Sequence, residues 1–246
     1  MPARQDRGIL LPLKFLIGHR AYRAASRPAA LALQHTPDRV KYGIGEWMRR
    51  SKMPYSVVRP GDTVVQVGAP RDLVRAGRSR SVYFLRRVGP GGRVVVFEPD
   101  LESASYLEEF AARNGLGDRL IMVRKGAWSK DDTLTFLSNP NHPASNLVKG
   151  ARDIDTSHYV ETSIPVTSLD AELRRLGIPT PRLVSITANG SETAILSGME
   201  GLIRDGVGYI ALARTGADYP GMMKKFGYEL AANDDRGFTF SRPQRA

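Results

Sequence analysis

From residue 57 onward, short runs of consecutive apolar residues alternate with longer segments in which apolar residues recur every three or four positions. Consecutive apolar and β-branched residues indicate strands buried on both faces, and the longer spacing indicates helices with one buried side. The pattern predicts strands at 63–67, 93–98, 120–124, 133–137, 163–167, 183–187 and 209–213. It predicts helices at 72–88, 101–114, 169–176, 191–203 and 219–226.

This alternation is typical of an α/β fold in which helices cover both faces of a mostly parallel sheet. A polar, turn-rich region at 138–160 interrupts it once. Near the C-terminus, two strand-like runs at 228–232 and 237–241 are joined by a turn-rich connection at 233–236. A connection this short joins antiparallel neighbours, so the two runs predict an antiparallel hairpin at one edge of the sheet.

The chain before residue 57 has a different pattern. Helical spacing is found near 13–33 and again near 38–51, where Val40, Ile44 and Trp47 recur on one side. Pro54 then ends the helical pattern. We therefore divide the chain into an N-terminal helical segment, 1–56, and one α/β domain, 57–246.

Charge separates the two parts further. The chain carries a net charge of +11, and residues 1–60 hold 12 Lys and Arg against 3 acidic residues, so +9 belongs to this quarter. The apolar run at 9–18 is interrupted by Lys14 and followed by His19 and Arg20. It is therefore shorter than the roughly 20 apolar residues of a membrane span, and no clear signal-peptide cleavage site follows it.

Two interpretations of the basic segment are open. The commoner case is a helix packed on the domain with a solvated basic face; the other is a surface helix that binds anionic lipid or an acidic partner. We expect a cytoplasmic location, with peripheral attachment to a membrane as the alternative. The absence of cysteine excludes disulfides, thiolate metal sites and a cysteine nucleophile.

The carboxyl ends of parallel strands are where ligands bind in such sheets. Four strand ends carry candidate residues, namely Gly68, Glu98, the pair Ala127 and Trp128, and Thr187. Glycine allows the backbone to approach a ligand closely, and an acidic residue at this place accepts hydrogen bonds from ribose hydroxyls. Glu98 precedes Pro99 and Asp100, so capping of the following helix is its alternative role.

Six motifs follow one another along the chain: GDTVVQVGA at 61–69, VGPGGRVVVFEPD at 88–100, RNGLGDR at 113–119, KGAW at 125–128, VTSLD at 166–170 and LVSITANGSETAI at 183–195. In this order they resemble the FkbM family of methyltransferases. The resemblance covers about residues 57–205. It implies a Rossmann-like class I methyltransferase sheet with S-adenosylmethionine as cofactor. The sequence contains no cluster of residues with the spacing of a metal site. The implied cofactor-binding residues are Gln66, Gly68, Ala69, Glu98, Ala127 and Trp128.

The chain departs from the family pattern at several positions. Gln66 stands where the family has an aspartate, and Pro70-Arg71-Asp72 where it has Asn-x-Gly. Thr187 and Asn189 replace two carboxylates near the fourth strand, whereas Gly190 and Glu192 are retained. The three carboxylate replacements keep hydrogen-bonding capacity but cannot act as a general base near neutral pH.

The resemblance implies that Thr187, Asn189 and Glu192 lie on the catalytic, acceptor side of the site. His142 and Asn146, in the polar region that would cover the strand ends, are candidate substrate contacts, although a loop histidine is more often simply solvated. Trp128 either stacks on an adenine or belongs to the core.

The expected function is S-adenosylmethionine-dependent O-methylation of a hydroxyl on a small molecule, a sugar or a lipid-linked glycan. The alternative is a catalytically impaired methyltransferase fold that serves as a binding or scaffold module, because binding survives loss of a base more easily than catalysis. Nucleic acid is a less expected partner, since the positive charge precedes the domain and has few aromatic residues among it.

Overall fold

The computed structural model describes residues 36–213, 218–234 and 237–243. The helix expected near 13–33 and the apolar run at 9–18 lie outside the described residues. The helix expected at 38–51 is present as α2 (Asp38–Arg49). Among the described residues, no helix is long and apolar enough to cross a bilayer.

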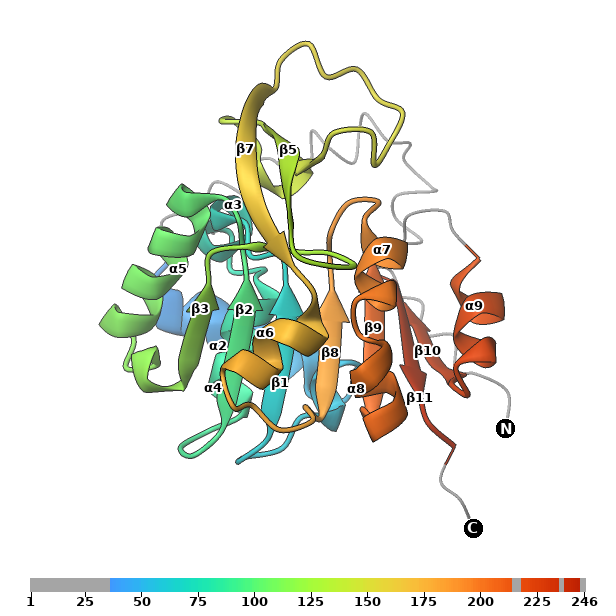
Figure 1. Cartoon of the computed structure of the whole chain (residues 1–246). Coiled ribbons are helices and arrows are strands. Elements are labelled where there is room, and N and C mark those ends of the chain that lie inside the picture. The colour runs from blue at the N-terminus through green and yellow to red at the C-terminus, as the bar shows by residue number, and fades with distance from the viewer. Residues whose placement is uncertain (1–35, 214–217, 235–236, 244–246) are drawn as a thin grey trace, which may run out of the picture.

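A seven-stranded sheet forms the centre of the domain (Figure 1). In spatial order its strands are β10 (Glu229–Asp234), β11 (Gly237–Ser241), β9 (Tyr209–Ala213), β8 (Leu183–Ile186), β1 (Thr63–Val67), β2 (Arg93–Phe97) and β3 (Leu120–Val123). The strands from β9 to β3 are parallel, whereas β11 is antiparallel to both β9 and β10. The mostly parallel sheet and its antiparallel C-terminal hairpin are therefore confirmed.

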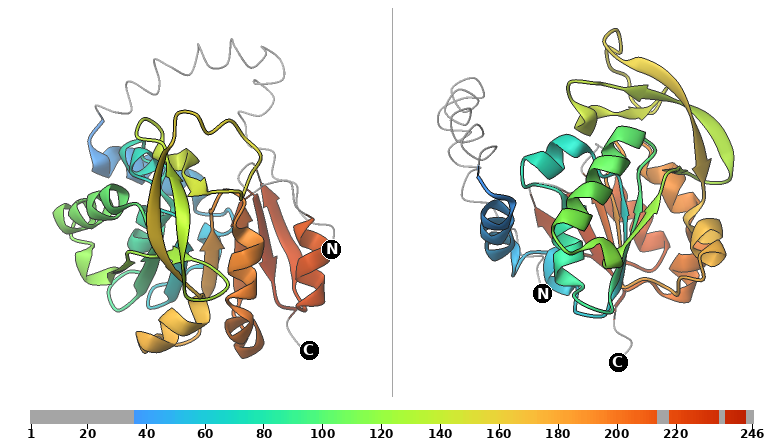
Figure 2. Two further views of the ribbon diagram at one scale, coloured as in Figure 1. Left: turned by 45° about the horizontal axis from the view of Figure 1, so that its top comes forward. Right: turned by 90° about the vertical axis from the view of Figure 1, so that its left-hand side faces the viewer.

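Helices cover both faces of this sheet, as the right-hand view of Figure 2 shows. One face packs against α2, α3 (Arg71–Arg75), α4 (Arg80–Arg87) and α5 (Leu101–Arg113). The other face packs against α6 (Leu169–Arg175), α7 (Glu192–Ser197), α8 (Glu200–Asp205) and α9 (Tyr219–Lys225). The buried strand runs between the two layers supply both cores, which explains why they lack alternation.

Two of the expected helices are each divided in two. The segment expected as one helix at 72–88 forms α3 and α4, with Gly77 between them at φ 65°. A positive φ ends a right-handed helix, and glycine adopts it without steric cost. The helix expected at 191–203 forms α7 and α8, with Gly198 and Met199 between them.

A second, four-stranded sheet stands over the carboxyl ends of the central strands (Figure 1). Its order is β4 (Gly126–Ala127), β7 (Val160–Thr167), β5 (Asp132–Ser138) and β6 (Leu147–Val148). The turn-rich region at 138–160 supplies β6 and a short 3₁₀ turn at Pro143–Ser145. We call residues 138–148 the roof, because they lie over the strand ends where a ligand is expected.

The side of α2 that faces the domain is not the side that carries its apolar row. The helix buries Lys41, Tyr42 and Gly45. Val40, Ile44 and Trp47, whose spacing predicted the helix, are 48%, 54% and 65% exposed. The periodicity predicted the helix correctly, but its apolar row points away from the domain.

Candidate functional site

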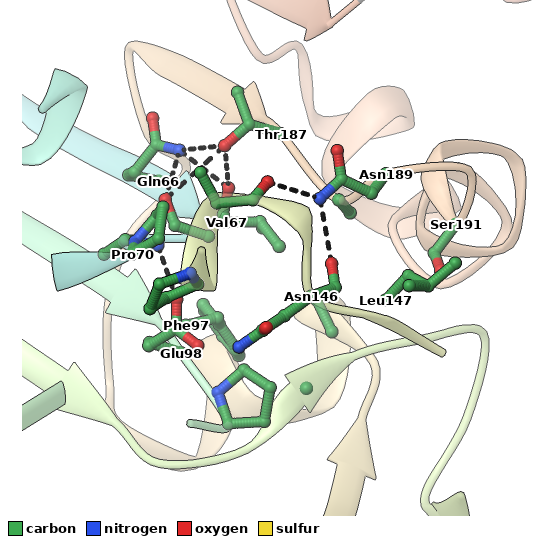
Figure 3. A pocket seen from close by; sticks show the side chains of 18 of the residues that line it. Gln66, Val67, Pro70, Phe97, Glu98, Asn146, Leu147, Thr187, Asn189 and Ser191 are labelled. Atoms are coloured by element: carbon green, nitrogen blue, oxygen red, sulfur yellow. Dashed lines mark hydrogen bonds between the residues drawn. The ribbon is translucent and has the colours of Figure 1, made fainter. Parts of the chain in front are cut away.

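Strand order reverses between β1 and β8, because the chain runs outward from β1 to β3 and then returns to the other side of β1. Ligands of doubly wound sheets bind at this switch point. A cavity of about 290 Å³ lies there, between the carboxyl ends of β1, β2 and β8 and the roof (Figure 3). Its volume is at the lower end of the range for sites that enclose small ligands.

Eight of the eleven candidate residues from the sequence line this cavity. They are Gln66, Gly68, Ala69, Glu98, Ala127, Asn146, Thr187 and Asn189. Strands and loops far apart in the sequence therefore bring together residues from 66 to 189. The remaining three, Trp128, His142 and Glu192, are not among the lining residues.

Glu98 follows β2 directly and is only 5% exposed. Its Oε2 accepts a hydrogen bond from the N–H of Ala69 at 2.6 Å, and its Oε1 accepts one from the N–H of Asp100 at 3.0 Å. Burial raises the pKa of Glu98 to about 7, although both backbone N–H groups act to lower it. Two carboxylate oxygens offer about four acceptor sites, so capacity remains for hydroxyl donors.

The capping alternative for Glu98 does not hold. The N-cap of α5 is Asp100, whose carboxylate accepts from the N–H of Ser103 at 3.1 Å. Glu98 instead connects the end of β2 to the loop after β1, through Ala69. Its place at the wall of the cavity is therefore not explained by the needs of the helix.

Gly68 has φ 84°, a conformation that favours glycine. A Cβ built at this position would lie 2.4 Å from the carbonyl oxygen of Thr187. Glycine is thus required both by the backbone and by the close approach of the loops after β1 and β8.

Gln66 and Thr187 contact each other directly (Figure 3). The Gln66 Nε2 donates to Thr187 Oγ1 at 3.0 Å and to the carbonyls of Val67 and Gly68 at 2.6 and 2.9 Å. Thr187 Oγ1 in turn donates to the Val67 carbonyl at 2.8 Å. These two departures from the family pattern therefore form one hydrogen-bonded unit.

Asn189 fastens the roof. Its Nδ2 donates to the carbonyls of Ala144 and Asn146 at 2.9 and 2.8 Å, and its backbone has a positive φ of 49°. The Asn146 Oδ1 accepts from the N–H of Asn139 at 2.7 Å, within the roof itself. Both asparagines line the cavity, and both use side-chain groups in hydrogen bonds that hold the roof in place.

Three candidates lie elsewhere. Glu192 is buried, and its oxygens accept from the N–H groups of Ala188 and Gly190 at 3.2 and 2.9 Å, which fixes the loop after β8. Trp128 packs against an apolar cluster of the second sheet. His142 is exposed on the roof, with its Nδ1 2.8 Å from Asp72 Oδ2.

The loop that replaces the family's Asn-x-Gly also bonds the roof. Arg71 pairs with Glu102 and donates to the carbonyl of Pro140 at 3.1 Å. It is not among the residues that line the cavity. The positive charge of Arg71 is thus neutralised by Glu102, outside the cavity.

The sequence did not indicate the segment Arg78-Ser79-Arg80, which lines the cavity at the start of α4. Because 72–88 was expected as one helix, these residues were placed inside a regular amphipathic segment. The signal that was available is Gly77, which ends α3. Among the described residues lining the cavity, the titratable side chains are Glu98, Arg78 and Arg80.

Comparisons with known proteins agree with this geometry. Residues 66–229 match the family model described as the methyltransferase FkbM domain. No curated protein sequence matches the chain. Among solved structures, methyltransferase FkbM from Methylobacillus flagellatus is similar at 16% identity and a TM-score of 0.50, with 91% of this chain and 60% of that protein covered.

Two further solved structures are similar at lower scores. A SAM-dependent O-methyltransferase from Thermotoga maritima is similar at 13% identity and a TM-score of 0.41, covering 82% of this chain and 72% of that one. Fibrillarin from Aeropyrum pernix, in complex with natively bound S-adenosyl-L-methionine, gives 12% identity and a TM-score of 0.45, covering 82% and 74%. The chain spans about 60% of the length of the FkbM protein above.

Proposed function

Because the chain belongs to the FkbM methyltransferase family, we propose that its cavity binds S-adenosylmethionine and that the protein methylates a hydroxyl on a small molecule, a sugar or a lipid-linked glycan. One observation carries the proposal: Glu98 is a buried carboxyl with spare acceptor capacity at the end of β2, in the wall of the cavity. A carboxylate in this place accepts the two hydroxyls of a ribose.

Different residues of the chain would bind the cofactor and position the acceptor. Glu98 holds the ribose, and Gly68, which also lines the cavity, lies at the methionine end of the cofactor. The bound cofactor supplies an activated methyl group on a sulfonium. The roof, held by Asn189, excludes water and fixes the acceptor, so positioning is the main contribution of the protein.

The acceptor side offers no dedicated base among the described residues that line the cavity. Thr187 and Asn189 are neutral, and their hydrogen-bonding groups serve the loop and the roof. Glu192, the retained carboxylate, is turned to its own loop. Transfer would therefore rely on alignment of donor and acceptor rather than on proton abstraction by these residues.

Calorimetric titration with S-adenosylhomocysteine tests the proposal. We expect Glu98→Gln to weaken binding about 10- to 100-fold, since hydrogen bonds to a charged group are lost. Glu109→Gln, an exposed carboxylate on α5, is the matched control and should leave affinity unchanged. Absence of any binding by the wild-type protein at millimolar ligand would overturn the proposal.

The second candidate function is binding without turnover. The internal Gln66–Thr187 unit favours it, and so does the described lining, in which the one carboxyl, Glu98, is assigned to the ribose and leaves the acceptor without a base. Transfer of a radiolabelled methyl group to a panel of hydroxyl acceptors separates the two. Labelled product supports the enzyme, whereas tight cofactor binding with no product on sugars, glycolipids or small alcohols supports the binding module.

A further inference from the structure

A buried cation lines the cavity and contacts β8. Arg80 is 9% exposed, begins α4 and lines the cavity. Its Nη1 donates to the Ser185 hydroxyl, in the middle of β8, at 3.1 Å. Within the described part of the chain, no carboxylate oxygen comes within 4.0 Å of its guanidinium.

The surroundings of Arg80 do not neutralise this charge. Gln66, which pairs in register with Ser185, is a neutral amide, and Thr187 is a neutral hydroxyl. A guanidinium offers five N–H donors, of which the Ser185 hydroxyl takes one. A buried charge without a counter-charge is costly, so this part of the cavity favours an anion over a neutral or cationic group.

Arg80 and Glu98 line the cavity beside the strands on either side of β1. Glu98 follows β2 and Arg80 reaches β8, and these two strands flank β1. Two strand spacings separate β2 from β8, roughly 10 Å. A ligand that contacts both residues therefore carries hydroxyls at one end and an acidic group about this far away.

We propose that Arg80 is the specificity-determining residue that binds the α-carboxylate of an amino acid joined to a nucleoside, whose ribose lies at Glu98. The inference rests on the proposed function and goes beyond it in assigning the anionic subsite to a residue outside the motif series. It also sets the orientation of the ligand, with the nucleoside beside β2 and the amino acid beside β8.

Calorimetry with two ligands tests this assignment. S-Adenosylhomocysteine carries the amino acid, and 5′-methylthioadenosine has the same nucleoside and thioether without it. Arg80→Met should weaken S-adenosylhomocysteine about 10- to 100-fold, because charge-assisted hydrogen bonds are lost, and leave methylthioadenosine within about twofold. Glu98→Gln should weaken both ligands alike. Arg93→Met, an exposed arginine at the start of β2, is the control and should change neither.

A comparison of ligands on the wild-type protein makes the result independent of any variant. The decarboxylated analogue of S-adenosylhomocysteine keeps the ammonium and lacks the carboxylate. It should bind more weakly than methylthioadenosine, because its ammonium faces the Arg80 guanidinium. Arg80→Met should reverse this order.

A thermal melt separates binding from a structural role. Removing an unneutralised buried charge should keep or raise the Tm of the ligand-free protein, whereas removing a structural arginine lowers it. Equal weakening of both ligands by Arg80→Met, or no weakening of S-adenosylhomocysteine, would overturn the assignment while leaving the proposed function intact. If the wild type binds neither ligand, the proposed function fails, and the assignment fails with it.

A second inference rests on an independent feature, the outward side of α2. Val40, Ile44, Trp47 and Met48 follow one another at helical spacing and are 48–65% exposed. Arg39, in the first turn of α2, and Arg50, directly after its last residue, are both exposed, and the Arg50 guanidinium lies 4.7 Å from the centre of the Trp47 ring. We call these four apolar residues the α2 row.

The charges beside the α2 row are positive. The two acidic residues of α2 are already paired, Asp38 with Lys41 and Glu46 with Arg86. An exposed apolar row that contains tryptophan, with arginines beside it, matches helices that lie in the headgroup region of anionic membranes. We infer that the α2 row docks on an anionic lipid surface.

Flotation of the full chain with vesicles tests this second inference. We expect binding to phosphatidylcholine vesicles that contain phosphatidylglycerol, weaker binding to pure phosphatidylcholine, and loss of binding in the double variant Ile44→Ser and Trp47→Ser. Val160→Ser, an equally exposed apolar residue on β7, is the control. Binding that survives the double variant would contradict the inference, as would a dimer in light scattering that the double variant abolishes.

Discussion

Glu98 links the protonation of the protein to its stability. Burial raises its pKa to about 7, from an ordinary value near 4.5. Because the folded pKa lies above the unfolded one, folding favours the protonated carboxyl. The stability that this group contributes is complete below about pH 4.5 and is lost as the pH rises through about 7.

Urea unfolding of the wild type and Glu98→Gln at several pH values measures this linkage. The wild type should lose up to about 3 kcal/mol relative to the variant between about pH 5 and pH 8, since one pKa unit corresponds to about 1.4 kcal/mol. Subtracting the two proteins cancels the titration of other groups. A difference that does not vary with pH would contradict the raised pKa.

Gln66 and Thr187 show why single positions of the family pattern cannot be changed independently. The amide that replaces a carboxylate donates to the hydroxyl that replaces another, and both bond the carbonyl of Val67. An aspartate at either position would face these oxygens without a donor. The two replacements are therefore compatible with each other and with the loop.

A double-mutant cycle tests this unit. Gln66→Met and Thr187→Val keep approximate size and remove the hydrogen-bonding groups. We expect each to cost about 1–3 kcal/mol of unfolding free energy, with a coupling of about 1 kcal/mol between them. Costs that simply add would show that the two side chains act separately.

At the residue scale, the sequence was most informative where a residue ends a strand. Glu98, Gly68 and Thr187 could be placed in one site because the carboxyl ends of parallel strands share one edge of the sheet. Arg80 could not, since its burial depends on the break at Gly77 and on the hydroxyl of Ser185 across the fold. Contacts of this range leave no periodic signal in the chain.

Among the elements, the roof is joined to the second sheet by the backbone pairing of β6 with β5, and to the loops after β1 and β8 by side chains. Asn189 holds Ala144 and Asn146, and Arg71 holds Pro140. The family pattern has a carboxylate where Asn189 stands, and a carboxylate cannot donate to two carbonyls. This means of holding the roof follows from the asparagine of this chain.

Hydrogen exchange checks the role of Asn189. Asn189→Gly keeps the positive φ accessible and removes both hydrogen bonds, so amide exchange over residues 143–148 should accelerate about tenfold or more. Ser197→Ala is the control, because its hydroxyl bonds only the carbonyl of Thr193 in its own helix. Unchanged exchange in the roof would show that other contacts hold it.

Elements were predictable to the extent that their pattern is local. The predicted bounds of strands such as β1 and β9 match the observed bounds to the residue, because runs of buried apolar residues have sharp ends. The breaks after α3 and α7 were not predicted, because two short helices in succession show the same apolar spacing as one long helix. The spacing in α2 did not indicate which side faces outward, because spacing fixes which residues share a side and not which side packs.

At the scale of the whole molecule, most of the net positive charge and the candidate site lie in different parts of the chain. The net charge of +9 on residues 1–60 precedes the domain. The cavity lies at the carboxyl ends of the central strands, with one carboxyl and two arginines in its lining. The sheet order places β1 between β2 and β8, so the carboxyl and the cation lie on either side of it. One extended ligand can therefore contact both.

A crystal structure of the protein grown with S-adenosylhomocysteine tests the central claim most directly, namely that this cavity is the cofactor site. The account predicts the ligand at the carboxyl ends of β1, β2 and β8, with its ribose hydroxyls on Glu98 and its carboxylate on Arg80. A ligand bound elsewhere, or a cavity that stays empty at millimolar concentration, would contradict it.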